Sequence, residues 1–116
     1  MEMAVVYSWT ASRPGMVKAG AANKAEVDAR MAKLLEEGKI TDFAWYLASQ
    51  AGPHMLIIRG SAESLMATTS DMEEMALRMR SALVNEGFTW GMYATGATAE
   101  AVMGMYLQAA EEVGAT

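Results

Sequence analysis

The sequence predicts an α+β domain whose elements follow the order strand, helix, strand, strand, helix, strand, helix. Three observations support this prediction. They are short runs of β-branched and aromatic residues, segments with apolar residues every three or four positions, and turn residues that separate the two kinds of segment. A chain of 116 residues and 12.5 kDa has room for one such domain, which we expect to span residues 1–116.

Four segments have the composition of strands. Residues 3–9 are too continuously apolar for a half-exposed strand, which indicates a buried one. Residues 40–49 and 54–59 flank the turn sequence Gln50-Ala-Gly-Pro53 and predict a β-hairpin. Residues 88–95 complete the set as the fourth strand.

The first helix is predicted to begin at Asn23, because Asn23 and Glu26 have the spacing of a capping box. Apolar residues then recur with helical spacing as far as Gly38, which we expect to be the glycine that ends the helix. Residues 10–22 show no sustained period and contain Pro14. They predict a long loop of the kind that often forms a lid or a binding loop.

A second helical segment starts at Ser61 and restarts at a capping box formed by Ser70 and Glu73. Residues 98–113 predict the C-terminal helix. Most of the 12 methionines fall on helix stripes, so we interpret them as core packing and not as copper(I) ligands. The methionines assigned to the core are Met31, Met72, Met75, Met79 and Met103.

Charge and composition exclude several classes of function. A net charge of −5 and a pI near 4.8 disfavour binding to nucleic acid or to an acidic membrane surface. The chain has no cysteine, no apolar stretch of membrane-spanning length and no secretion signal, so we expect a cytoplasmic protein. No metal site and no nucleotide-binding motif is recognised, and we expect no cofactor.

The element order is that of the split βαβ, or ferredoxin-like, arrangement, a four-stranded antiparallel sheet with a C-terminal helix added. Both faces of the predicted strands are apolar, as Val5 and Tyr7 against Ala4 and Val6 illustrate. Helices cover one face of such a sheet, and the other face also needs a cover. A second copy of the chain related by a two-fold axis would provide it, so we expect a homodimer that the C-terminal helix could brace.

In element order the sequence resembles the dimeric α/β-barrel superfamily, whose members pair two ferredoxin-like protomers around a barrel with a small-molecule pocket in each protomer. The resemblance covers most of the chain and identifies no subfamily. It implies a protein similar to antibiotic-biosynthesis monooxygenases that need no cofactor, to muconolactone-isomerase-like or EthD-like proteins, or to haem-degrading and chlorite-dismutase-like enzymes. The single histidine disfavours the haem branches.

A symmetric pairing of the hairpin about Ala51 and Gly52 assigns side chains to the two faces of the sheet. It places Tyr46 opposite Ile57 and predicts that Asp42, Tyr46 and Arg59 face the barrel interior. We expect the other substrate-binding residues to face the same interior. These are Tyr7, Trp9, Trp90 and Met92.

The polar candidates for catalysis are His54, Arg59, Tyr46 and Asp42. Each has a structural interpretation as well. The aromatic side chains could pack the sheet faces or the dimer contact. His54 could be a solvated or backbone-bonded residue at the hairpin tip, and Arg59 with Asp42 could be either an ion pair or a clamp for an anion.

Two classes of function remain. One is a cofactor-independent enzyme, similar to a monooxygenase or to an isomerase or cyclase, that acts on a hydrophobic aromatic or polyketide-like molecule. The other is a non-catalytic ligand-binding, sensor or assembly protein on the same dimer. The scarcity of acid–base groups, with one histidine and no cysteine, favours the second class, whereas the aromatic sheet and the long loop favour the first.

Overall fold

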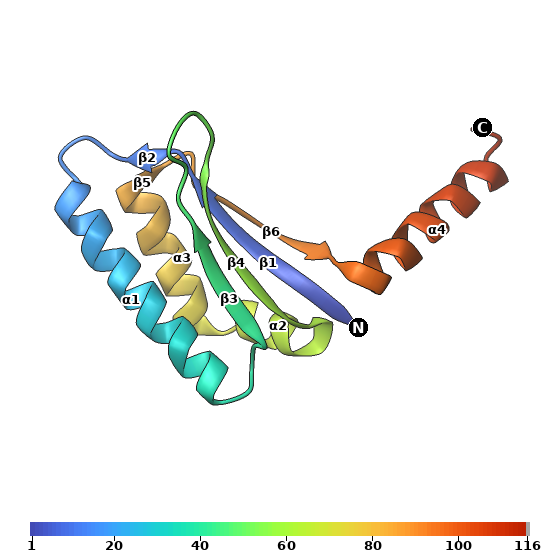
Figure 1. Ribbon diagram of the computed structural model, residues 1–116, viewed down its shortest axis with the longest axis horizontal. Helices are drawn as coiled ribbons and strands as arrows, with labels where there is room; N and C mark the ends of the chain where they lie inside the picture. Colours follow the sequence, from blue (N-terminus) through green and yellow to red (C-terminus); the bar gives the residue numbers. More distant parts are fainter. Residues whose placement is uncertain (116) are drawn as a thin grey trace.

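The computed structural model describes residues 1–115 as a four-stranded antiparallel sheet with helices on one face (Figure 1). The sheet has the order β3-β4-β1-β6 and consists of β1 (Glu2–Trp9), β3 (Asp42–Tyr46), β4 (His54–Ser61) and β6 (Thr89–Ala94). Two short strands, β2 (Ala11–Ser12) and β5 (Asn85–Glu86), pair with each other. The helices are α1 (Val17–Glu36), α2 (Ala62–Thr69), α3 (Met72–Val84) and α4 (Gly96–Glu112). The predicted ferredoxin-like arrangement with a C-terminal helix is therefore confirmed.

Helix α1 begins earlier than predicted, so most of the expected loop over residues 10–22 does not exist. Asn23 lies inside the helix and does not cap it, which makes the predicted capping box wrong. Gly20 also lies inside the helix, where a Cβ atom would come within 3.0 Å of the Ser12 hydroxyl oxygen. The glycine therefore allows α1 to approach β2 closely. At the other end, Gly38 has φ +73° and follows the helix as expected.

The predicted interruption of the second helical segment is confirmed. Ser61 caps α2, since its hydroxyl oxygen accepts a hydrogen bond from the Ser64 backbone N–H at 3.1 Å. The chain then leaves the helix at Ser70 and enters α3 after Asp71. The capping box expected at Ser70 and Glu73 is wrong, because Asp71 occupies the N-cap position and no side chain caps the helix.

The covered face of the sheet holds the core. Val5 of β1 lies beside Ile58 of β4, and Tyr7 lies beside Leu56, with all four side chains at most 4% exposed. They pack against the helices and the segments that join them to the sheet. The residues that complete this core are Val27, Met31, Leu34, Ile40, Leu65 and Leu77.

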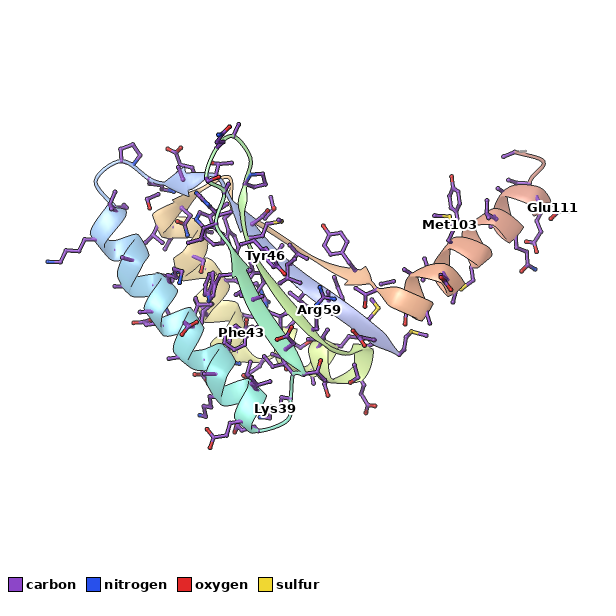
Figure 2. All side chains as sticks on the ribbon, in the orientation of Figure 1. Lys39, Phe43, Tyr46, Arg59, Met103 and Glu111 are labelled. Carbon is purple, nitrogen blue, oxygen red and sulfur yellow. The ribbon has the colours of Figure 1, made fainter. Side chains whose placement is uncertain are left out.

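The opposite face of the sheet has no helix over it (Figure 1). It carries Val6, Ile57 and Tyr93, together with the predicted Asp42, Tyr46 and Arg59. Figure 2 shows Phe43 on the side of α1 and Arg59 on the other side of the sheet. We refer to this uncovered surface as the open face.

The hairpin has a register two residues away from the predicted one. Tyr46 pairs with Met55 and not with Ile57, while Asp42 pairs with Arg59. The strand pairing ends at Tyr46 and Met55. In the loop that follows, the imidazole Nδ1 of His54 accepts a hydrogen bond from the Ala48 backbone N–H at 3.0 Å. A shift of two residues keeps every side chain on its predicted face, because side chains alternate with a period of two.

The prediction that Tyr7, Trp9, Trp90 and Met92 face the open side is wrong. Tyr7 pairs with Trp90 and with Leu56, and this set of side chains faces the helices. The reason is volume. The larger side chains of β1 and β6 fill the space beneath the helices, whereas Ala4, Ser8 and Gly91 lie on the open face.

The methionine prediction holds only for Met31, which is fully buried. Met72, Met75, Met79 and Met103 are exposed, because α3 and α4 turn other faces toward the sheet or extend away from it. Within residues 1–115 no helix combines the length and the apolar character needed to cross a bilayer.

A buried ionic network joins α1 to α3 and to the sheet. The Arg30 guanidinium binds the carboxylates of Asp71 at 2.9 Å, Glu73 at 3.1 Å and Glu74. The Tyr7 hydroxyl donates to the other Glu74 oxygen at 2.5 Å. The Glu74 side chain is 1% exposed, so its charge depends on these partners.

Removing Arg30 from this network tests how much the fold depends on it. We expect Arg30→Met to lower the free energy of unfolding by about 3–5 kcal/mol, because Glu74 then keeps a buried charge without its cation. Glu73→Gln, which alters the exposed member of the same cluster, is the control and should change the free energy by no more than about 1 kcal/mol. Urea unfolding at one fixed protein concentration measures both values. If Arg30→Met lowers the free energy of unfolding by less than Glu73→Gln does, the stabilising role given to Arg30 is wrong.

Tyr7 predicts how stability changes at alkaline pH. Burial raises the pKa of its hydroxyl above the ordinary value of 10.0, and the Glu74 carboxylate raises it further. The folded state therefore holds this proton more tightly than the unfolded chain, a contribution that is complete below pH 10.0 and is lost above it. We expect Tyr7→Phe to flatten the alkaline decline in the free energy of unfolding. Below pH 10.0 the difference in the free energy of unfolding between the two proteins should stay constant.

Candidate functional site

A pocket of about 310 Å³ lies between the covered face of the sheet and helix α1, at the end of the sheet where β2 and β5 pair. This volume is within the range of small-molecule sites. Its lining combines an aromatic and aliphatic wall with one polar end. The lining residues are Tyr7, Trp9, Ser12, Val17, Gly20, Ala21, Asn23, Lys24, Val27, Trp45, Leu47, His54, Leu56, Ser81, Asn85 and Phe88.

Aromatic rings from neighbouring strands form the wall of the pocket. Trp9, at the end of β1, lies beside His54 in the ladder, with ring centroids 5.6 Å apart. Trp45 of β3 meets Trp9 edge to face at 6.0 Å. The rings of Tyr7 and Phe88, which also line the pocket, have centroids 5.9 Å apart. Such a wall suits a flat, apolar ligand, which it can contact through ring faces and edges.

Helix α1 fixes the position of Trp45. The indole Nε1–H donates to the Asp28 carboxylate at 2.9 Å, and the Lys24 ammonium lies 4.2 Å from the centre of the ring. Asp28 and Lys24 both lie in the segment after Asn23, which the sequence predicted to be helical. Lys24 therefore contributes a positive charge to the pocket lining, where it favours a ligand with anionic character.

His54 presents a defined hydrogen-bond donor to the pocket. Its Nδ1 accepts the backbone N–H of Ala48, so the neutral ring carries its proton on Nε2. The sheet holds the ring against Trp9. The Nε2–H group is thus oriented by the strand and by the ring stack, and it can donate to a ligand oxygen.

The polar end of the pocket contains a buried acceptor that lacks a donor. The Asn23 side chain is 9% exposed, and its Nδ2 donates to the Ser81 hydroxyl at 2.9 Å. Its Oδ1 atom has no hydrogen-bond partner among residues 1–115. A buried carbonyl oxygen without a donor costs free energy, and a ligand that brings a hydroxyl or N–H group there removes the cost.

The structure divides the predicted site residues between two faces of the sheet. Tyr7, Trp9 and His54 line the pocket together, although Tyr7 and Trp9 were expected on the opposite side. Asp42, Tyr46 and Arg59 lie on the open face and take no part in lining it. Asp42 and Arg59 are cross-strand neighbours, but within residues 1–115 no ion pair forms between them.

Trp90 and Met92 lie on the covered face but do not line the pocket. Trp90 is at the edge of the sheet, where the Arg78 guanidinium lies 4.2 Å from the centre of its ring. These two residues therefore belong to packing at the β6 edge. Their predicted role in substrate binding has no geometric support in this pocket.

Sequence reasoning missed Asn23, Lys24, Ser81 and Asn85. The signal for Asn23 was its spacing. It precedes Val27 and Met31 at four-residue intervals, which places an amide on the buried stripe of α1. Ser81 has the same relation to Leu77 on α3. A polar residue on a buried stripe is more informative than a polar residue that could be a cap, because its hydrogen bonds must be made inside the protein.

Within residues 1–115, no group of three or more His, Asp or Glu side chains lies close enough together to hold a metal ion. The pocket itself offers Lys24, His54 and the hydroxyl of Tyr7 as its titratable side chains. The Tyr7 hydroxyl is engaged with Glu74 and its pKa is raised by burial, so it remains protonated near neutrality. The pocket is equipped to bind and to donate hydrogen bonds more than to remove protons.

No protein-family model matches this sequence, and no curated protein matches it. Several solved structures resemble its fold, and three of them illustrate the range. Rv0793 from Mycobacterium tuberculosis is 17% identical, with a TM-score of 0.65, and the match covers 83% of this chain and 96% of Rv0793. SnoaB, a cofactor-independent oxygenase from Streptomyces nogalater, is 11% identical at a TM-score of 0.59, over 81% of this chain and 92% of SnoaB. A dimeric protein of unknown function from Bacteroides fragilis is 13% identical at 0.55, over 78% of this chain and 94% of that one.

Identities this low carry information about the fold and not about chemistry. The Bacteroides protein is described as having a ferredoxin-like fold, which agrees with the strand order and the helical layer seen here. The chain therefore has a ferredoxin-like fold.

Proposed function

We propose that this chain binds a hydrophobic aromatic or polyketide-like molecule in the pocket beside α1 and oxidises it with molecular oxygen, without a bound cofactor. The observation that carries the proposal is the pairing of an aromatic wall with the unpartnered Asn23 oxygen. A ligand that satisfies both must be flat and apolar and must carry a hydroxyl or N–H group. The oxygenase reaction is our choice among the reactions open to such a pocket, and it is suggested by SnoaB, a protein of similar fold that is a cofactor-independent oxygenase.

The reaction requires the substrate to act as its own reductant. A phenolic substrate with an activated methylene group can lose a proton to water and pass electrons from the resulting anion to oxygen. The proton returns when the reduced oxygen leaves as water. The balance is R–CH2–R′ + O2 → R–CO–R′ + H2O. In this scheme the Asn23 oxygen accepts a substrate hydroxyl. Lys24 and the His54 Nε2–H stabilise the oxygen on which negative charge develops.

The alternative is a ligand-binding protein without catalysis. It is favoured by the small number of titratable side chains around the pocket. An isomerase or cyclase would use the same pocket but would need a group that moves protons, and His54 is the candidate for that role. Oxygen consumption separates the first proposal from both alternatives.

The pocket can be tested by filling it. Ala21 is exposed on α1 and lines the pocket, so Ala21→Trp should place a ring in the cavity without disturbing the core. We expect the variant to bind a hydroxylated anthrone at least tenfold more weakly than the wild-type chain. Quenching of tryptophan fluorescence measures the affinity. Ala29→Trp, at an exposed position of the same helix away from the pocket, is the matched control. Equal affinity in the two variants would exclude the pocket as the binding site.

Catalysis is tested with the same hydroxylated anthrone in an oxygen electrode. The wild-type chain should consume oxygen and form the corresponding anthraquinone, above the rate without protein. Asn23→Leu should lower kcat/KM by about tenfold to a hundredfold, because it removes the acceptor for the substrate hydroxyl. Binding without oxygen consumption would instead support the ligand-binding alternative. Anaerobic conversion to an isomer would support the isomerase or cyclase.

The second part of the proposal is that the protein acts as a homodimer through the open face. Val6, Ile57, Tyr46 and Tyr93 give this face an apolar surface, and Tyr46 and Tyr93 are 48% and 56% exposed. A similar fold is dimeric in the Bacteroides protein. The observation that carries this part is the absence of any helix over the face (Figure 1).

A charge on the open face should break the dimer. We expect light scattering to give twice the chain mass for the wild-type protein and a shift toward the monomer for Tyr46→Asp, because an interface buries the new carboxylate. Leu35→Asp, at a similarly exposed apolar residue of α1, is the control and should remain dimeric. A monomeric wild-type protein at micromolar concentration would refute the dimer.

A further inference from the structure

Helix α4 leaves the body of the molecule. It starts beyond β6 and extends away from the sheet and the helical layer (Figure 1). Figure 2 shows Met103 and Glu111 well separated from the rest of the chain. Between residues 102 and 107 of α4, every residue except Gly104 is apolar and 50–69% exposed. These residues are Val102, Met103, Met105, Tyr106 and Leu107. A helix of this kind gains most of its stability from packing, so this surface needs a partner.

The surface of α4 is amphipathic. At 100° per residue, Val102, Tyr106 and Ala110 lie on one side of the helix, while Glu100 and Glu111 lie on the other. The helix contains three glutamates and no lysine or arginine. Its apolar side therefore faces outward without cover, bordered by negative charge.

Helix α3 carries a second apolar surface of the same kind. Met72, Met75, Met79 and Leu83 recur at helical spacing and are 37–76% exposed. We refer to these four residues as the α3 stripe. The opposite side of α3 faces the core through Glu74, Leu77 and Ser81, so the α3 stripe lies on the side of the helix turned away from the core. Of the two arginines beside the stripe, Arg78 donates to the Thr69 carbonyl at 2.8 Å and lies against Trp90, whereas Arg80 is half exposed and lies 3.6 Å from Glu26.

We propose that α4 of one chain packs on the α3 stripe of a second copy, and that two such contacts, related by the two-fold axis, clasp the dimer. The inference rests on the proposed dimer and adds a second contact to it. A two-fold axis makes the exchange reciprocal, since each chain offers one α4 and one α3 stripe. Both surfaces are apolar, and the glutamates of α4 are opposite in charge to the half-exposed Arg80 beside the α3 stripe.

Two further observations favour a second copy as the occupant. Within the chain, α4 makes its contacts with β1 and β6, at its own start, and the rest of it points away from α3. A membrane surface is a poor alternative, because an interfacial helix normally carries lysine or arginine on its polar side and α4 carries glutamate.

Methionine oxidation provides the test, because the rate of sulfoxide formation follows exposure. In the isolated chain Met79 is 63% exposed and Met16 is 41% exposed, so Met79 would oxidise at least as fast. If α4 of the partner covers the α3 stripe, Met79 should oxidise about fivefold more slowly than Met16 in the full-length dimer treated with hydrogen peroxide. Peptide mass spectrometry gives both rates in one sample, and light scattering gives the oligomeric state.

A variant of α4 then links the protection to this helix. Tyr106→Glu should raise the oxidation rate of Met79 to at least that of Met16, although the two residues belong to different helices. Gln108→Glu, on the polar side of α4, is the control and should leave Met79 protected. Circular dichroism confirms that each variant is folded.

The outcomes separate the inference from the proposed function. A dimer in which Met79 oxidises as fast as Met16 overturns the α4 contact and leaves the dimer standing. A monomeric wild-type protein with unprotected Met79 overturns both. Protection of Met79 in a monomer, or protection that Tyr106→Glu does not change, means that something other than the partner's α4 covers the α3 stripe and also overturns the inference.

Discussion

The structure depends on one constraint, which is that the helices cover only one face of a sheet that is apolar on both. Beneath the helices, Val5, Tyr7, Leu56 and Ile58 form a closed core. On the other side, Val6 and Ile57 are half-buried and Tyr93 is exposed, and no helix of residues 1–115 lies over them. The covered face holds the pocket in which we propose that a ligand binds, and the open face holds the proposed contact between copies. Binding and assembly are therefore assigned to opposite sides of the same four strands.

The pocket exists because the helical layer is attached to the sheet unevenly. Around Arg30 the network with Glu74 and Tyr7 holds α1 and α3 tightly against the strands. At the other end of α1, the polar residues Asn23 and Ser81 bond to each other and leave space above the strands, where Trp9 forms part of the wall. The buried charges stabilise one end of the layer, and the loosely filled end is available to a ligand. This placement gives Tyr7 two roles, as a wall of the pocket and as a partner of Glu74.

Helix α3 shows why apolar spacing alone was misleading. Its most regular apolar stripe is the α3 stripe, yet the helix buries Glu74, Leu77 and Ser81 instead. The polar residues can be buried because each has a partner on α1, in Arg30 and Asn23. Exposure of the α3 stripe is then a consequence of that choice, whereas the apolar side of α4 is exposed because the helix extends away from the sheet. Both surfaces lack cover within one chain, and the proposed exchange of α4 accounts for both.

The sequence by itself determined the elements, their order and the ferredoxin-like arrangement, because strand composition, turn residues and helix spacing are local properties of the chain. It also determined that Asp42, Tyr46 and Arg59 share a face. Side chains alternate between the two faces of a sheet, so an error of two residues in register leaves each of them on the same face. Only the tertiary structure decided which face of β1 and β6 the helices cover, and that decision placed Tyr7 and Trp9 in the pocket. Burial of Asn23 and Ser81 was decided there too, because a polar residue can be buried only where a partner from another element meets it.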